Sequence, residues 1–342
     1  MTSTLSSPEE LFRRAEAGDR TAIAKLLTSI ERGGEPAREI GLLAAPRAGA
    51  ACTVGLTGAP GSGKSTLTSA IVGLLLGQDE EVAVLAVDPS SPFSGGAILG
   101  DRVRMQDHAM DVGVFIRSMA TRGHLGGLAL ATPEAIRLLD ALGYARILVE
   151  TVGVGQVEVE IAGKADTTVV VVNPGWGDSV QAAKAGLMEV ADVFVINKAD
   201  RKGVDDTRRD LQQMLALSAE TSGDGDGWQV PIVATVASDG SDGQGVAELW
   251  AAITHHQQHA AASGLLERRR RARLGEELGA IIAGRLEQRA RQLCRGERWD
   301  ELVDQVLDRR LDPWAAADEL LAPVLSSPIG SQQSIAEDRT DG

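Results

Sequence analysis

The sequence predicts an α/β fold, in which a mostly parallel sheet carries helices on both faces. Two observations lead to this prediction. Short apolar runs alternate with helical patterns between residues 52 and 250, and such alternation is typical of parallel strands joined by crossover helices. Several of these runs, for example residues 168–172, are apolar without interruption, as expected of strands that are buried on both faces.

The expected elements follow from the spacing of apolar residues. Strands are short runs bounded by turn residues, and helices carry apolar residues every three or four positions. The predicted strands cover residues 52–57, 82–88, 112–117, 145–150, 168–172, 193–197 and 230–236. The predicted helices between them cover residues 64–77, 132–142, 178–190, 204–217 and 245–260. Because parallel strands end at one edge of a sheet, we expect a ligand at that edge.

Helical segments flank this core on both sides. In the N-terminal segment, residues 8–45 suggest two short helices separated at Gly18–Asp19 and a third that begins at Pro36. We therefore expect four regions, which are an N-terminal helical segment 1–48, a sheet-bearing domain 49–262, a C-terminal helical arm 263–325 and a disordered tail 326–342.

The C-terminal arm contains two amphipathic stretches that have no strands of their own. The first carries an apolar stripe made of Leu274, Leu278, Ile281, Ile282, Leu286 and Leu293, and the second covers residues 302–311. These faces must be covered, either by the main domain or by a second copy of the chain, and we favour a homodimer. The Arg-rich run 268–273 could suggest RNA binding, but an exposed helix face within a dimer arm is the preferred interpretation.

Composition limits the partners and the compartment. The 342-residue chain has a formal net charge of −14, which argues against nucleic acid as a main partner. It has no apolar run long enough for a membrane span and no leader-like N-terminus. Its two cysteines, Cys52 and Cys294, lie far apart without metal-ligand spacing. We therefore expect a soluble cytoplasmic protein.

A glycine-rich loop joins the first predicted strand of the sheet to a helix. Residues 58–65 read Gly-Ala-Pro-Gly-Ser-Gly-Lys-Ser and fit the phosphate-loop (P-loop) pattern G-x-x-x-x-G-K-[ST]. Such a loop points backbone N–H groups and a helix N-terminus at a polyphosphate. Lys64 would contact the β- and γ-phosphates, and Ser65 would bind Mg²⁺. The nucleotide-binding residues predicted here are Gly58, Ala59, Pro60, Gly61, Ser62, Gly63, Lys64, Ser65 and Thr66.

A second motif predicts which base is bound. Asn197-Lys198-Ala199-Asp200 follows a strand and matches the guanine-reading pattern N-K-x-D. The Asp200 carboxylate can accept hydrogen bonds from guanine N1–H and its exocyclic amine, whereas adenine presents a lone pair at N1. The later residues Thr235, Val236 and Ala237 could offer backbone N–H groups to guanine O6.

Three acidic residues are candidates for a Mg²⁺ site together with Ser65. Asp88 and Glu150 end predicted strands, and Asp101 lies in a glycine-rich segment. Mg²⁺ prefers hard oxygen ligands and keeps several waters, so one or two direct carboxylates are enough. Turn or cap roles would explain each acid alone, but a shared metal site explains their common position at strand ends better.

Longer segments resemble the MeaB/ArgK GTPases, the G-protein chaperones of methylmalonyl-CoA mutase within the SIMIBI class of P-loop GTPases. The resemblance covers residues 8–322, and the segments that carry it are 88–105, 115–127, 150–156, 174–186 and 311–318.

The resemblance implies a Mg²⁺-dependent GTPase that binds GTP and GDP and assists an adenosylcobalamin-dependent acyl-CoA mutase. It would gate cofactor loading and protect the mutase, and adenosylcobalamin would be bound only by that partner.

The resemblance also implies roles for individual residues. Lys64, Asp101, Glu150 and Gln156 would form the catalytic group, and Gln156 and the 174–186 loop would be switch elements, with Gln181 and Lys184 contacting the partner or the nucleotide. The C-terminal arm would form the homodimer.

Other functions stay open at this point. His255, His256 and His259 could indicate a nickel metallochaperone of the same class, although a solvated helix face is the simpler explanation. An ATP-dependent kinase linked to amino-acid transport is an older label of the family, and Asp200 argues against it. A structural adaptor that never turns over its nucleotide is a further alternative.

Overall fold

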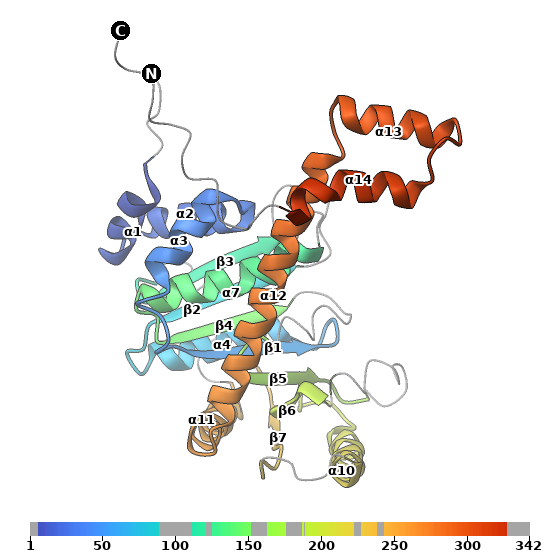
Figure 1. The fold of residues 1–342 in the computed structure, drawn as a ribbon. Coiled ribbons are helices and arrows are strands. Elements are labelled where there is room, and N and C mark those ends of the chain that lie inside the picture. The colour runs from blue at the N-terminus through green and yellow to red at the C-terminus, as the bar shows by residue number, and fades with distance from the viewer. Residues whose placement is uncertain are drawn as a thin grey trace. The chain divides into compact units, whose positions relative to one another are not determined.

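The structure is a computed structural model that describes residues 6–88, 111–120, 125–151, 163–175, 187, 189–221, 227–237 and 243–326. Within these residues, seven strands form one sheet in the order β3-β2-β4-β1-β5-β6-β7, and every pairing in the sheet is parallel (Figure 1). The strands are β1 (Cys52–Gly58), β2 (Val82–Asp88), β3 (Val114–Ala120), β4 (Arg146–Thr151), β5 (Thr167–Val172), β6 (Val193–Asn197) and β7 (Ile232–Thr235). The predicted α/β fold is confirmed.

Helices cover both faces of this sheet. Among the residues that the structure describes, the helices between strands are α4 (Lys64–Leu76), α7 (Leu125–Ala141) and α10 (Val204–Thr221), and α11 (Val246–Ala262) follows β7. Alternate strand residues point to opposite faces. On one face, Val169 and Val171 of β5 share a core with residues of α4 and α11. On the other face, Val170 and Val172 share a core with residues that include Leu211 of α10.

The N-terminal helices belong to the same core as the sheet. They are α1 (Pro8–Glu16), α2 (Arg20–Arg32) and α3 (Glu35–Ala44), and they pack with β2, β3, β4 and α7 in one hydrophobic cluster. The predicted break at Gly18–Asp19 is confirmed, because Asp19 caps α2 through Oδ1, which accepts from the N–H groups of Thr21 and Ala22 at 2.9 and 3.1 Å. This capping explains why the chain starts a new helix there.

Two predicted elements are displaced in the structure. Strand β3 begins at Val114 instead of residue 112, since Val112 and Gly113 form a turn and Val112 is 95% exposed. Helix α7 begins at Leu125 and contains Pro133 in its interior, whereas the sequence suggested a start near that proline. The predicted helix 178–190 lies mostly outside the described residues.

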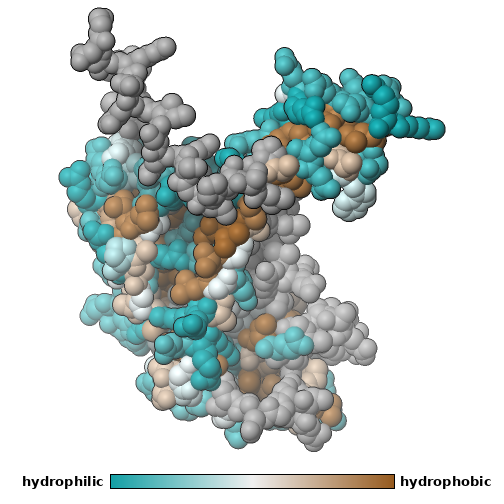
Figure 2. Space-filling view, viewed as in Figure 1, coloured by the Kyte–Doolittle hydropathy of each residue, from teal (hydrophilic) through white to brown (hydrophobic). Residues whose placement is uncertain are grey.

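The chain divides into two compact units, Met1–Glu277 and Leu278–Gly342. Helix α12 (Leu265–Leu293) begins in the first and ends in the second, and the second also contains α13 (Glu297–Leu307) and α14 (Pro313–Ser326). Helix α14 lies within the expected helical arm 263–325 but was not predicted as a separate helix; its start is capped by Asp312 Oδ1, which accepts from the N–H groups of Trp314 and Ala315. Figure 2 shows hydrophobic surface on this second unit, where Trp314 is 83% exposed.

Among the described residues, no helix combines the length and the hydropathy that a membrane span requires.

Candidate nucleotide-binding site

The predicted P-loop connects β1 to α4 at the carboxyl edge of the sheet, and close contacts require glycine at two of its positions. At Gly58, where φ is +139°, a Cβ atom would lie 2.0 Å from the Val171 carbonyl oxygen. At Gly63, where φ is +88°, it would lie 2.5 Å from Asn197 Nδ2. The two ends of the loop are therefore in close contact with the ends of β5 and β6.

The Lys64 ammonium lies inside this loop. The side chain is buried, and its Nζ donates to the Gly58 carbonyl at 2.7 Å and to the Ala59 carbonyl at 3.2 Å. Ser62 is fully buried, and no described residue bonds its hydroxyl. The positive charge of Lys64 therefore lies beside the backbone that a polyphosphate would contact.

Ser65 and Glu150, predicted to share a metal site, are brought together by the fold. Ser65 Oγ donates to Glu150 Oε1 at 2.6 Å, and Glu150 is 1% exposed. Glu150 lies on β4 between Leu56 of β1 and Ala86 of β2. A hydroxyl beside a buried carboxylate is a hard oxygen donor set of the kind that Mg²⁺ prefers, so these residues fit that ion.

The other predicted metal and catalytic residues are described only in part or not at all. Asp88 is the last residue of β2, two positions beyond Ala86, the register partner of Glu150. It therefore lies at the same edge of the sheet, but its side chain is outside the described atoms. Asp101 and Gln156 lie outside the described residues, as do Gln181 and Lys184.

Asn197 connects the predicted base-reading segment to the P-loop. It is 2% exposed. Its Nδ2 donates to the Ser62 carbonyl at 2.8 Å, and its Oδ1 accepts from Thr235 Oγ1 at 3.1 Å and from the Ala237 N–H at 3.3 Å. The Val236 N–H donates to the Gln244 carbonyl at 2.9 Å. In this structure, Thr235 and Ala237 therefore support Asn197, and the contact of residues 235–237 with guanine O6 stays a prediction.

Lys198 and Asp200 follow Asn197 on a turn beside the loop. Lys198 adopts a left-handed backbone with φ of +58°, and its Nζ donates to the Gly61 carbonyl at 2.6 Å. Asp200 is exposed, so its carboxylate is accessible to a base.

Sequence reasoning missed one polar residue at this site. Asn173 directly follows β5, and its Nδ2 donates to the Gly61 carbonyl at 3.3 Å. A polar residue directly after a continuous apolar strand was the available signal.

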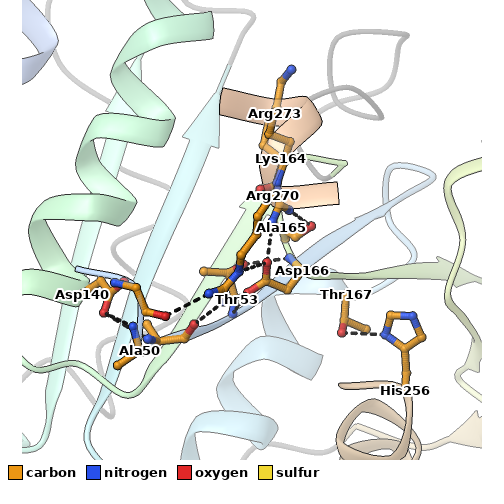
Figure 3. A network of polar contacts seen from close by, with 12 residues as sticks. Ala50, Thr53, Asp140, Lys164, Ala165, Asp166, Thr167, His256, Arg270 and Arg273 are labelled. Atoms are coloured by element: carbon orange, nitrogen blue, oxygen red, sulfur yellow. Dashed lines mark hydrogen bonds and ion pairs between the residues drawn. The ribbon is translucent and has the colours of Figure 1, made fainter. Parts of the chain in front are cut away.

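A network of polar contacts lies at the opposite, amino-terminal edge of the sheet (Figure 3). Arg270 of α12 donates to Asp166, at the start of β5, with Nη2 to Oδ2 at 2.6 Å, and to the Gly49 and Ala51 carbonyls at 2.9 Å each. Arg273 also pairs with Asp166, which is 4% exposed. Burial raises the pKa of Asp166, but hydrogen bonds and charge from both arginines outweigh it, so that the pKa lies below its ordinary value.

This network corrects the expectation for the Arg-rich run. Arg269 pairs with Asp192 at 2.9 Å, and Arg270 and Arg273 pair with Asp166. An exposed helix face is therefore wrong for these three arginines. Their acidic partners precede β5 and β6, far away in the sequence, so helical spacing could not reveal them.

The three histidines differ in exposure: His255 is exposed as expected of a solvated helix face, His259 is half-buried, and His256 is buried, so the expectation is wrong for His256. His256 is fully buried on α11, where its Nδ1 lies 2.9 Å from Thr167 Oγ1. The rings of all three histidines lie around Trp228, with centroid distances of 5.3 Å for His255, 5.0 Å for His256 and 5.3 Å for His259. In the part of the chain that the structure describes, no group of three or more His, Cys, Asp or Glu side chains could hold a metal ion.

Comparisons with known proteins identify relatives along most of the chain. A family model described as "Methylmalonyl Co-A mutase-associated GTPase MeaB" matches residues 23–294. A Pyrococcus abyssi protein named as a GTPase is 46% identical over 326 residues, which cover 95% of this chain and 99% of that protein. The GTPase ArgK of Escherichia coli is 40% identical over 265 residues, which cover 75% of this chain and 78% of that protein.

A solved structure extends the similarity to the fold. The crystal structure titled "LAO/AO transport system kinase" has a TM-score of 0.65 and a sequence identity of 27%, and the match covers 95% of this chain and 100% of that chain.

Proposed function

Because the chain belongs to the MeaB family of GTPases, we propose that it acts as the GTP-dependent chaperone of an adenosylcobalamin-dependent acyl-CoA mutase. The observation that carries this proposal is the family match over residues 23–294, since that family is described as associated with methylmalonyl-CoA mutase. The protein would gate cofactor loading and protect the mutase, which alone would bind adenosylcobalamin.

We assign phosphate binding to the P-loop, residues 58–66. Lys64 bonds its own loop carbonyls, Gly58 O and Ala59 O. An ammonium held this way needs only a small movement to contact the β- and γ-phosphates, because its three N–H groups can exchange acceptors. Electrostatic stabilisation and positioning supply most of the catalysis of phosphoryl transfer, which fits a buried lysine that is hydrogen-bonded within the loop.

We assign metal binding to Ser65, Asp88, Asp101 and Glu150. When bound, Mg²⁺ would neutralise charge on the β- and γ-phosphate oxygens. The Ser65 hydroxyl, which donates to Glu150 in this structure, and the buried Glu150 carboxylate would help to hold the ion. Gln156 remains the candidate for positioning the attacking water.

We assign guanine selection to Asp200. Asn197 fixes the distance between this segment and the P-loop through the Ser62 carbonyl, and Asp200 is exposed beside it. A carboxylate held there can accept from two guanine N–H groups, and an adenine base would leave it without donors.

We assign homodimer formation to the C-terminal arm, residues 263–325. Leu278, Ile282 and Leu286 follow one another at four-residue spacing on α12 and are 51–59% exposed. Burying such a stripe against a second copy would remove a large apolar area from water. Ile282→Asp should therefore yield a monomer in light scattering after size exclusion, while Glu287→Lys on the opposite side of the helix should stay dimeric; a dimeric Ile282→Asp variant would exclude this arm.

Affinity capture with a purified acyl-CoA mutase tests the chaperone function. The tagged protein should retain the mutase with a non-hydrolysable GTP analogue, retain less of it with GDP, and hydrolyse GTP faster when the mutase is present. Lys64→Ala should lose the nucleotide dependence. Equal retention with every nucleotide and an unchanged hydrolysis rate, measured with mutases for methylmalonyl-CoA and isobutyryl-CoA, would refute the proposal. Preference for ATP over GTP would instead support the kinase alternative.

A further inference from the structure

A single polar side chain follows the fully buried strand β5 at its nucleotide-facing end. Residues Thr167–Val172 are buried throughout, and Asn173 comes directly after them. Val171 is the register partner of Gly58, so Asn173, two residues further along, lies beside the residues that follow Gly58 in the P-loop. This position gives Asn173 direct access to the loop.

Asn173 and Lys198 share one acceptor. The Asn173 Nδ2 donates to the Gly61 carbonyl at 3.3 Å, and the Lys198 Nζ donates to the same oxygen at 2.6 Å. Donors from the ends of two different strands, β5 and β6, therefore converge on the apex of the P-loop. The adjacent carbonyl, that of Ser62, is held by Asn197.

The other end of the Asn173 amide is buried without a hydrogen bond to any described residue. Its Oδ1 is inaccessible to solvent and has no donor there. A buried amide oxygen without a donor is destabilising, so a nearby donor would be strongly favoured. The Lys198 ammonium is such a group, because it has three N–H donors and already bonds the oxygen that Asn173 contacts.

We propose that Asn173 is a positioning residue of the nucleotide site, which holds the Gly61 carbonyl through Nδ2 and the Lys198 ammonium through Oδ1 when nucleotide is bound. In a trans peptide the C=O and the N–H point in opposite directions, so holding the Gly61 carbonyl also orients the N–H of Ser62. That N–H donates to the Ala59 carbonyl at 3.2 Å, and this hydrogen bond forms the turn of the loop. Asn173 thus preserves the loop shape that binds phosphate. This inference rests on the proposed nucleotide site.

Nucleotide dissociation from the full-length protein tests this role. With fluorescent GDP and GTP analogues, Asn173→Ala should release nucleotide about tenfold faster than the natural protein, the factor expected from one or two lost hydrogen bonds. Thr207→Val is the matched control. Thr207 Oγ1 accepts from the Gly175 N–H at 3.1 Å, so this change loosens the same turn without touching the P-loop and should leave the rate unchanged.

A double-mutant cycle with Lys198→Met separates positioning from a general structural effect. If Asn173 acts through Lys198 and Gly61, Asn173→Ala should accelerate release less than about threefold in the Lys198→Met background, because coupled contacts are not additive. Additive effects, or an Asn173→Ala rate equal to that of the natural protein, would overturn the proposal. A Lys64→Ala variant that binds GTP normally would instead refute the nucleotide site itself.

Discussion

Replacing Arg270 with alanine should remove a large part of the stability of the first unit. The guanidinium donates to the Gly49 and Ala51 carbonyls, which precede β1, and pairs with both oxygens of Asp166. Breaking a buried ion pair costs about 3–5 kcal/mol. Arg273 still pairs with Asp166 after the change, and the Arg270 side chain is 33% exposed, so we expect a loss of about 2–3 kcal/mol in the free energy of unfolding.

The loss should also depend on pH in a direction set by Asp166. Because the arginines lower the pKa of Asp166 in the folded state, its ion pairs stabilise the fold above the unfolded-state pKa. That contribution disappears as the pH falls through the lower folded-state pKa. The difference between the natural protein and Arg270→Ala should therefore be constant from pH 8 to about pH 5 and should shrink below about pH 4.

Equilibrium unfolding by urea, followed by circular dichroism, measures this difference. Arg271→Ala is the matched control, because Arg271 is the next residue on α12 and is exposed; it should change stability by less than about 0.5 kcal/mol. Equal stabilities of Arg270→Ala and Arg271→Ala at pH 7 would refute the view that this network ties α12 to the sheet.

Two further changes test other parts of the structure. Burial, followed by repulsion from Glu277, raises the pKa of Glu134 to about 7, so the neutral acid favours folding at low pH and this advantage is lost as the pH rises from about 4.5 to 7. The Glu134→Gln variant should therefore be about 1–2 kcal/mol more stable to unfolding than the natural protein at pH 8 and nearly equal to it at pH 4.5. A gain in stability that does not depend on pH would contradict this prediction. Gly63→Ala should abolish tight GTP binding in a calorimetric titration because the new Cβ would collide with Asn197. Gly61 has a similar positive φ and open space around it, so Gly61→Ala should lose much less GTP affinity. Equal losses of affinity in the two variants would show that the collision is not the cause.

The sheet could be predicted from the sequence because its signals are local. The run Thr167–Val172 is short and made entirely of β-branched residues, and this length and composition identify a buried strand. The P-loop could be predicted for a related reason, since Gly58, Gly63 and Lys64 lie within one short segment. The joint position of Ser65 and Glu150, which are 85 residues apart, followed from the rule that parallel strands end at one edge.

The remaining contacts could not be predicted because they join distant residues without a pattern. Arg270 and Asp166 are 104 residues apart, and nothing in the Arg-rich run indicates which arginines face the sheet. The burial of His256 depends on the packing of α11 against β5. The contact of Asn173 with Gly61 depends on the register between β5 and β1, which the sequence does not specify.

The most direct test of guanine recognition is nucleotide binding by Asp200→Asn. An amide at this position can donate to the C2 carbonyl of xanthine but can no longer accept from both guanine N–H groups, so GTP affinity should fall by about 100-fold or more and xanthosine triphosphate should bind better than GTP. Asp205→Asn, which removes the same charge from the first turn of α10, should bind GTP like the natural protein. An unchanged GTP affinity in Asp200→Asn would contradict the account of the site.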